Sequence, residues 1–300
     1  MALTSFLRPI AQLGLAVALL ACGSGSTTQQ AKEAAQEPFP YELSEPTQTY
    51  QLPRELKEVS GLGWYRKNQL VMVNDEQGKV FVYDIARGQV VETLSFGLKG
   101  DYEGVEVVGD EIFVVESNGV ITAFKAELPE TRVLDPGLPS KTEIEGLGYD
   151  AKANRLLLAV KSASKKGKEL HDKIVYTFDL KSKSVWQGLV IPEEVLQQAE
   201  KDFNLPKKEK LADCKLSGVA IHPQNRAIYL LASVGKKLLV VNRQGQISQV
   251  ISLNEKLFPQ PEGICFGPDG TLFIASESND KKGGKLFQFD VLSSLPTTQP

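Results

Sequence analysis

Glu103-Gly104-Val105 is the stretch that decides the fold, because its pattern returns along the chain at a nearly constant spacing. A short acidic or hydroxyl residue is followed by Gly and then by an aliphatic residue. The other copies are Ser60-Gly61-Leu62, Glu145-Gly146-Leu147, Ser217-Gly218-Val219 and Glu262-Gly263-Ile264. From one Gly to the next the chain advances 43, 42, 72 and 45 residues. A period in the low forties built from short strands is typical of β-propeller blades. The sequence therefore predicts an all-β propeller with five blades.

Each copy opens a first strand, and strand-like segments rich in Val, Ile, Leu and Phe follow it. The predicted second strands are residues 70–74, 112–116, 156–161, 227–232 and 271–276. The fifth unit ends before a fourth strand can form, whereas residues 47–52 form an orphan strand before the first unit. We expect this N-terminal strand to complete the last blade, which closes the ring and leaves no open sheet edge.

The 72-residue step is longer than the period. A sixth blade is one explanation, but residues 191–205 are typical of a short helix, with Pro192 near the start and Glu193 and Glu194 in the first turn. We therefore expect a short helical insertion between blades 3 and 4, with a six-bladed propeller as the alternative.

The N-terminus predicts export and lipid attachment. One positive charge, Arg8, precedes an apolar run that ends in Leu-Leu-Ala-Cys22-Gly, which resembles the lipobox of bacterial lipoproteins. The resemblance implies cleavage before Cys22 and acylation of its thiol, including palmitate; an ordinary signal peptide is the alternative. We expect residues 1–22 to be the signal peptide, 23–46 a flexible linker, 47–292 the propeller and 293–300 a disordered tail.

Composition excludes several classes of function. The net charge is −3 and no basic face is apparent, so we expect no nucleic-acid partner. Two histidines and three cysteines are too few for most Cys/His metal sites. His222 and His171 are expected to be structural and solvated, respectively. Cys214 and Cys265 are adjacent to neighbouring first strands; we expect free thiols, although a disulfide stays possible in the envelope.

The first strands of propeller blades line the central channel, so the residues before each Gly should face one another. Converging carboxylates repel, and a cation relieves that repulsion; an all-oxygen set favours Ca²⁺ over Zn²⁺. The expected metal-ligand candidates are Glu103, Glu145, Glu262, Asp75, Glu116 and Glu277, and the possible ligand contacts of the channel ring are Ser60, Ser217 and Asn74. The alternative is that each Glu before Gly accepts backbone N–H bonds and locks neighbouring blades together. Lys161 is able to pair with a carboxylate and reduce the need for metal.

Glu58-Val-Ser-Gly-Leu-Gly-Trp64, Leu70-Val-Met-Val-Asn-Asp-Glu-Gln-Gly78 and Asp101-Tyr-Glu-Gly-Val105 resemble the SdiA-regulated family of bacterial envelope proteins, which is similar to NHL-repeat propellers. The resemblance extends over residues 47–291 and implies a five-bladed propeller with a calcium site, in a family whose biochemical role is not established.

A second resemblance is to calcium-dependent lactonases and phosphotriesterases, six-bladed propellers whose first-blade Glu precedes a Gly. Here that position is Ser60, which counts against a direct transfer of their activity. We therefore expect a lipid-anchored cell-envelope protein, in the outer membrane, that binds calcium and a small-molecule ligand or envelope protein. No catalytic residue is assigned, and a calcium-dependent lactonase or esterase-type hydrolase is the alternative.

Overall fold

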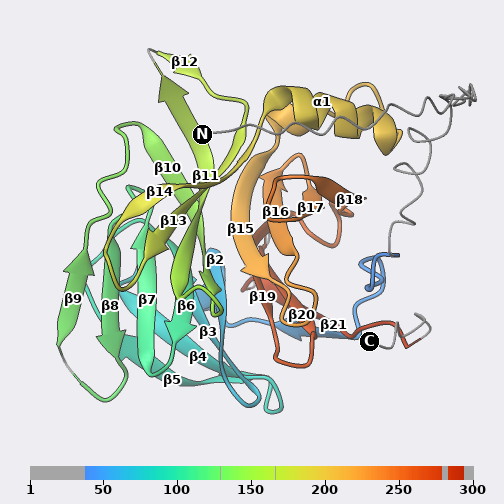
Figure 1. Cartoon of the computed structure of the whole chain (residues 1–300). Coiled ribbons are helices and arrows are strands. Elements are labelled where there is room, and N and C mark those ends of the chain that lie inside the picture. Colours follow the sequence, from blue (N-terminus) through green and yellow to red (C-terminus); the bar gives the residue numbers. More distant parts are fainter. Residues whose placement is uncertain (1–37, 129, 166, 279–282, 294–300) are drawn as a thin grey trace, which may run out of the picture. The chain divides into compact units, whose positions relative to one another are not determined.

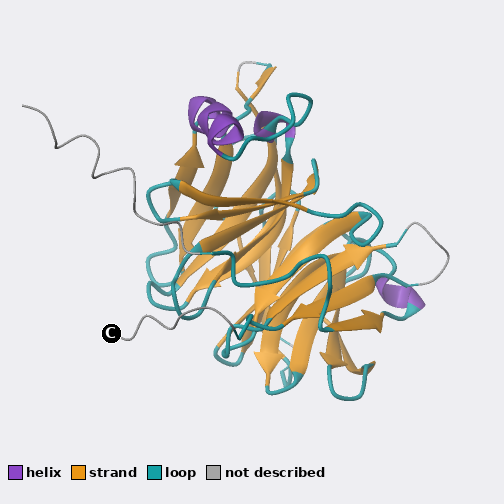
Figure 2. Cartoon of the chain, turned by 90° about the vertical axis from the view of Figure 1, so that its right-hand side faces the viewer, coloured by secondary structure: helices purple, strands orange, loops and turns teal. Residues whose placement is uncertain are grey.

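The computed structural model describes residues 38–128, 130–165, 167–278 and 283–293. These residues form five antiparallel sheets, the blades of a five-bladed propeller (Figures 1 and 2). Blade 1 consists of β2 (Val59–Arg66), β3 (Gln69–Asn74), β4 (Lys79–Asp84) and β5 (Gln89–Ser95). Blade 2 consists of β6 (Tyr102–Val108), β7 (Glu111–Glu116), β8 (Ile121–Lys125) and β9 (Thr131–Leu134).

Blade 3 consists of β10 (Thr142–Asp150), β11 (Arg155–Lys165), β13 (Lys173–Asp179) and β14 (Val185–Ile191), with the short β12 (Lys168–Glu169) paired to β11. Blade 4 consists of β15 (Lys215–Ile221), β16 (Ile228–Val234), β17 (Lys237–Val241) and β18 (Ile247–Ser252). Blade 5 consists of β19 (Gln260–Phe266), β20 (Leu272–Glu277), β21 (Lys285–Phe289) and β1 (Gln48–Gln51).

The N-terminal strand closes the ring, as the strand count predicts. β1 pairs antiparallel with β21, with Gln48 opposite Gln288 and Gln51 opposite Lys285. The innermost strands contact one another in the cyclic order β2, β6, β10, β15, β19 and again β2. Five blades are therefore present in the described residues, and the long step between blades 3 and 4 adds no sixth.

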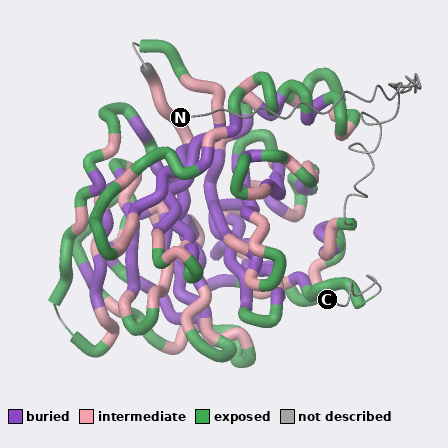
Figure 3. Tube along the Cα trace, viewed as in Figure 1, coloured by how far each residue is buried: buried purple, intermediate pink, exposed green. Residues whose placement is uncertain are grey.

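The hydrophobic core lies between neighbouring blades rather than within one layer (Figure 3). On β3, Leu70 and Met72 pack against blade 5, whereas Val71 and Val73 pack against blade 2. Because successive side chains of a strand point to opposite faces, a strand with a blade on each side must be apolar at every position. This explains the continuous apolar second strands in the sequence.

The insertion between blades 3 and 4 is a helix, as expected. α1 (Glu193–Asp202) follows Pro192, and two 3₁₀ turns are present, η1 (Arg54–Leu56) and η2 (Leu211–Asp213). Leu196 and Ala199 of α1 join the core cluster shared by blades 3 and 4. The helix and β12 lie at the same end of the sheets (Figure 1). We call this end, where each innermost strand begins, the mouth face.

The packed part of the chain begins earlier than the linker boundary expected at residue 46. Tyr41 and Leu43 are buried in the core cluster of blades 4 and 5. The Tyr41 hydroxyl donates to the Gly270 carbonyl at 2.7 Å and lies 2.9 Å from His222 Nε2. His222 Nδ1 accepts N–H bonds from the following turn, so this histidine is structural, as predicted.

Two further expectations concern thiols and membrane contact. Cys214 and Cys265 are buried and free, so the expected absence of a disulfide between them is confirmed. No helix among the described residues is long and apolar enough to cross a membrane. Cys22, the linker up to residue 37 and residues 294–300 lie outside the described part of the chain.

Candidate functional site

A β-bulge occurs at the same place in all five innermost strands, and it builds the site. In each blade the pairing register shifts across the residue that precedes the repeated Gly. In blade 2, for example, Tyr102 pairs with Glu116 and Gly104 with Val115, which leaves Glu103 without a cross-strand partner. A bulge redirects a side chain out of the alternating pattern of its strand. The bulged residues are Ser60, Glu103, Glu145, Ser217 and Glu262; we call them the channel ring.

The glycines let the bulges approach one another. A Cβ on Gly61 would lie 2.8 Å from the Gly104 Cα, and one on Gly146 would lie 2.8 Å from the Gly218 Cα. A Cβ on Gly104 would lie 2.6 Å from the Leu147 backbone nitrogen. Since these contacts are with backbone atoms that have little freedom to move, only Gly fits where the inner strands converge.

The two serines of the ring join neighbouring blades. Ser60 Oγ donates to the Tyr102 carbonyl at 2.6 Å, and Ser217 Oγ donates to the Pro261 carbonyl at 2.7 Å. Each bond runs from one blade to the backbone just before the ring residue of the next blade, and both hydroxyls are buried. The interblade latch that the sequence analysis considered for the glutamates is thus made by the serines.

The three glutamates of the ring are shielded from solvent to different degrees, because Glu103 is half-buried whereas the other two are buried. Glu145 is 8% exposed and Glu262 is 9% exposed. Burial, reinforced by Glu145 and Asp101, raises the pKa of Glu103 to about 9. Burial, reinforced by Glu145 and Glu277, raises the pKa of Glu262 to about 8. Within the described residues, neither Glu103 nor Glu262 forms an ion pair with a Lys, Arg or His side chain.

Glu145 differs because a lysine partners it. The Lys161 ammonium, near the end of β11, forms an ion pair with the Glu145 carboxylate, as the sequence analysis considered. Burial nevertheless keeps the pKa of Glu145 above its usual value, although the bond from Lys161 and its charge lower it. The ring therefore holds three carboxyl groups against one ammonium group.

Four of the five ring residues line a small cavity of about 10 Å³; Glu145 does not. The polar lining comes from Ser60, Glu103, Ser217 and Glu262. The rest comes from the inner-strand glycines and from the aliphatic residues Leu62, Leu147, Val219 and Ile264. One water molecule needs roughly 10–15 Å³ of this kind of volume. At the level of the ring the channel therefore has room for about one water molecule or one monatomic ion.

The second-strand ends contribute unequally to the mouth face. Burial, together with Asp75 and Glu58, raises the pKa of Glu277 to about 7. Burial and the charge of Glu58 raise the pKa of Asp75, whose buried Oδ1 has no hydrogen-bond partner in the described residues. These two carboxyls therefore belong to the same electrostatic cluster as the ring.

Two other candidates make hydrogen bonds outside the ring. Asn74 Nδ2 donates to the Glu55 carbonyl at 3.2 Å, and its Oδ1 accepts the Gln77 N–H at 2.9 Å. Glu116 Oε2 accepts a long bond of 3.4 Å from Asn118 in the following turn. Their side chains support these turns rather than the ring.

Two acidic residues that the sequence analysis did not select also lie near the axis. Asp101 is hydrogen-bonded to Glu103 and helps to raise its pKa. Glu106 stands two residues after Gly104, where the other blades have Gly63, Gly148, Ala220 and Cys265. Part of its surface stays accessible, but protein surrounds the carboxyl, and burial raises the pKa of Glu106 to about 7. A single Glu among four small residues at one repeat position is the signal that could have revealed it.

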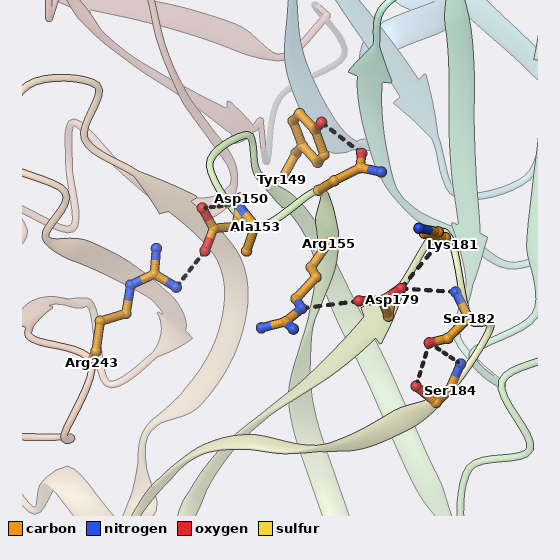
Figure 4. A network of polar contacts seen from close by, with 10 residues as sticks. Tyr149, Asp150, Ala153, Arg155, Asp179, Lys181, Ser182, Ser184 and Arg243 are labelled. Atoms are coloured by element: carbon orange, nitrogen blue, oxygen red, sulfur yellow. Dashed lines mark hydrogen bonds and ion pairs between the residues drawn. The ribbon is translucent and has the colours of Figure 1, made fainter.

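A contrasting carboxylate lies at the far end of β10. Asp150 is 4% exposed, and blade 4 supplies two arginines to it. Arg243 Nη1 lies 2.6 Å from Asp150 Oδ2 (Figure 4), and Arg226 pairs with Asp150 Oδ1. Burial alone would raise the pKa of Asp150, but the bond and charge of Arg243 and the charge of Arg226 lower it below the usual value. We call this group the arginine clamp.

Comparison with known proteins identifies a matching family and solved structures with a similar fold. The model of the SdiA-regulated family matches residues 46–280. Among solved structures, the glutaminyl cyclase of Myxococcus xanthus is similar, with a TM-score of 0.54 and 15% identity over 83% of this chain and 97% of that one. A luciferin-regenerating enzyme is similar with a TM-score of 0.50 and 10% identity over 83% of this chain and 96% of that one. Identities this low show a shared fold and nothing about activity.

Proposed function

This chain belongs to the SdiA-regulated family, and from that membership and the chemistry of the channel ring we propose that it is an envelope binding module whose ring holds a cation, Ca²⁺. Lipid at Cys22 would anchor the domain to the membrane. The mouth face would then present the occupied ring to a ligand or to another envelope protein.

One observation carries the proposal: the half-buried carboxyl of Glu103 and the buried carboxyl of Glu262 line a cavity of one-ion size, and neither forms an ion pair within the described residues. Burying an ionised carboxylate without a counter-charge is costly, so such groups pair, bind metal or stay protonated. Glu103 comes from blade 2 and Glu262 from blade 5, and both line the cavity of about 10 Å³. A cation there would allow both carboxyls to ionise and would link the two blades.

The donors fit a hard cation. Carboxylates, hydroxyls and backbone carbonyls are oxygen ligands, which suit Ca²⁺, and no His or Cys side chain lines the cavity. No three His, Cys, Asp or Glu side chains of the described residues are grouped as a ready metal site. Glu103 and Glu262 would therefore need backbone carbonyls or water to complete the coordination, as is common for Ca²⁺.

A binding role is favoured over the hydrolase alternative. A lactone or ester that reacts at the ring would have to reach an ion between Glu103 and Glu262. The cavity there admits about one water molecule, which leaves no room for an organic substrate at that level. The α1 insertion does not line this cavity.

The test is a thermal melt of the purified protein in EDTA and in a Ca²⁺ series, with Mg²⁺ as the ion control. Binding only to the native state stabilises it by RT ln(1 + [L]/Kd), about 2.7 kcal/mol at one hundred times Kd. We expect a saturable rise in Tm that is specific for Ca²⁺ and that disappears in Glu103→Gln/Glu262→Gln.

The matched control is Glu92→Gln, because Glu92 lies on β5 with its side chain 43% exposed and away from the ring. This variant should respond to Ca²⁺ as the unmodified protein does. No Ca²⁺-dependent rise in the unmodified protein would contradict the proposal, and so would an equal rise in the double glutamine variant.

A further inference from the structure

Lys161 is a fixed positive charge placed among the ring carboxyls. Its ammonium pairs with Glu145, and the charges of Glu145, Glu103 and Glu262 all raise the pKa of Lys161. In return, Lys161 lowers the pKa of Glu103 and, together with Lys236, that of Glu262, although burial keeps both raised. One ammonium group thus acts on glutamates from three blades.

The repeat shows that this charge is specific to blade 3. Lys161 stands two residues after Ala159, which pairs with the inner-strand Gly146. The same position in the other blades is Asp75, Ser117, Ser233 and Glu277. Four blades thus place an oxygen-bearing side chain there, and blade 3 places a cation.

We propose that Lys161 is the built-in counter-ion of the channel ring: its ammonium group offsets part of the negative charge that attracts the bound cation and thereby sets the affinity of the site. This inference rests on the proposed cation site. With Lys161 in place the three ring carboxylates carry a net charge of about −2 when ionised, which one divalent ion neutralises. Without it the same ion would meet three uncompensated carboxylates.

The exposure of the two side chains allows the Lys161 ammonium to move away from the ring. The Lys161 side chain is 37% exposed, whereas the Glu145 side chain is 10% exposed. The ammonium is therefore able to turn toward solvent while the buried carboxylate stays in the ring. Unit charges a few ångströms apart near a protein surface interact appreciably, so losing one nearby cation should change the Ca²⁺ affinity strongly.

The experiment is calorimetric titration of the full-length protein with CaCl₂, comparing the unmodified chain, Lys161→Met and Lys161→Arg. We expect Ca²⁺ to bind Lys161→Met at least tenfold more tightly than the unmodified chain, and Lys161→Arg to stay within about threefold of it. In EDTA, Lys161→Met should melt at a lower temperature, because Glu145 is left buried and unpaired.

The matched control is the double variant Lys161→Met/Glu145→Gln, which restores the ring charge of the unmodified chain. If Lys161 acts through its charge, the Ca²⁺ affinity of the double variant should return to near that of the unmodified chain. A second control, Lys125→Met, removes a cation that pairs with the exposed Asp110 outside the ring and should leave the affinity unchanged.

The outcomes separate this inference from the cation site itself. Equal Ca²⁺ affinity in Lys161→Met and the unmodified chain would overturn the role of Lys161 and leave the ring site intact. An affinity gain that persists in the double variant would also overturn it. Absence of Ca²⁺ binding in every variant, including Lys161→Met, would overturn the cation site and this inference with it.

Discussion

The carboxyl groups at the two ends of β10 have pKa values shifted in opposite directions. Near its start, Glu145 joins Glu103 and Glu262 in a ring where one lysine faces three carboxyls, and all three have raised pKa values. At its end, Asp150 receives two arginines and has a lowered pKa. The protein's own arginines neutralise the negative charge of Asp150 in the arginine clamp, whereas the single lysine of the channel ring does not neutralise three carboxylates.

The difference separates a stabilising site from a binding site. A buried carboxylate held by two arginines favours the ionised form and joins blade 3 to blade 4. Buried carboxyls without enough positive charge cost stability when they ionise, and proteins keep such groups mainly at functional positions. The same strand therefore contributes to stability at one end and, in our proposal, to ligand binding at the other.

The largest expected effect is on the pH dependence of stability. The unfolded chain loses the protons of Glu103 and Glu262 near pH 4.5, whereas the folded protein holds them up to about pH 9 and about pH 8. Between these limits the native state binds more protons, so the free energy of unfolding should fall as pH rises. Each carboxyl contributes a slope of up to about 1.4 kcal/mol per pH unit.

Urea unfolding in EDTA at several pH values between 5 and 9 measures this slope. Glu103→Gln/Glu262→Gln should flatten it, because glutamine does not titrate. An unchanged slope in the double variant would place the titrating groups elsewhere, with Glu106 and Glu277, whose pKa values are about 7, as the next groups to replace.

Asp150→Asn should have the next largest effect, with the opposite dependence on pH. The substitution removes the charge that pairs with Arg226 and Arg243, and we expect a loss of about 2 kcal/mol at pH 7, moderated because both arginines are partly exposed. Because the folded pKa of Asp150 is lowered, its contribution is present above the unfolded value of 3.8 and is lost as pH falls below it. Urea unfolding at pH 7 and pH 3 should show the difference shrinking; an equal loss at both values would mean that shape rather than charge is responsible.

Much of the fold could be predicted from the sequence, because the repeated Gly marks a place where five backbones meet. The blade number follows from the spacing of that residue. The closing strand and the helical insertion follow from the segments that the period does not account for. The beginning of the packed chain was missed, since Tyr41 and Leu43 stand among prolines and polar residues that are typical of a linker.

The site was only partly predictable, because its geometry depends on register. The sequence aligns Glu103, Glu145 and Glu262 but does not show that each lies in a β-bulge. It also does not show that the Asn74 side chain bonds to the backbone of Glu55 and Gln77 rather than to the ring. Whether the carboxyls bind metal depends on how many positively charged side chains lie next to them, and the spacing of the repeat does not determine that number.

The smallest expected effect distinguishes the two residue types of the ring. Ser60→Ala removes a buried hydrogen bond to the Tyr102 carbonyl and should cost about 1–2 kcal/mol of stability at every pH, without changing Ca²⁺ affinity by more than a few fold. Glu103→Gln keeps the shape of the side chain, should cost little stability in EDTA at neutral pH, and should weaken Ca²⁺ binding strongly. Urea unfolding and calorimetric titration of both variants test this contrast. If Ser60→Ala abolished Ca²⁺ binding while retaining its fold, the serine would be a ligand, and the division of the ring into latching serines and binding glutamates would not hold.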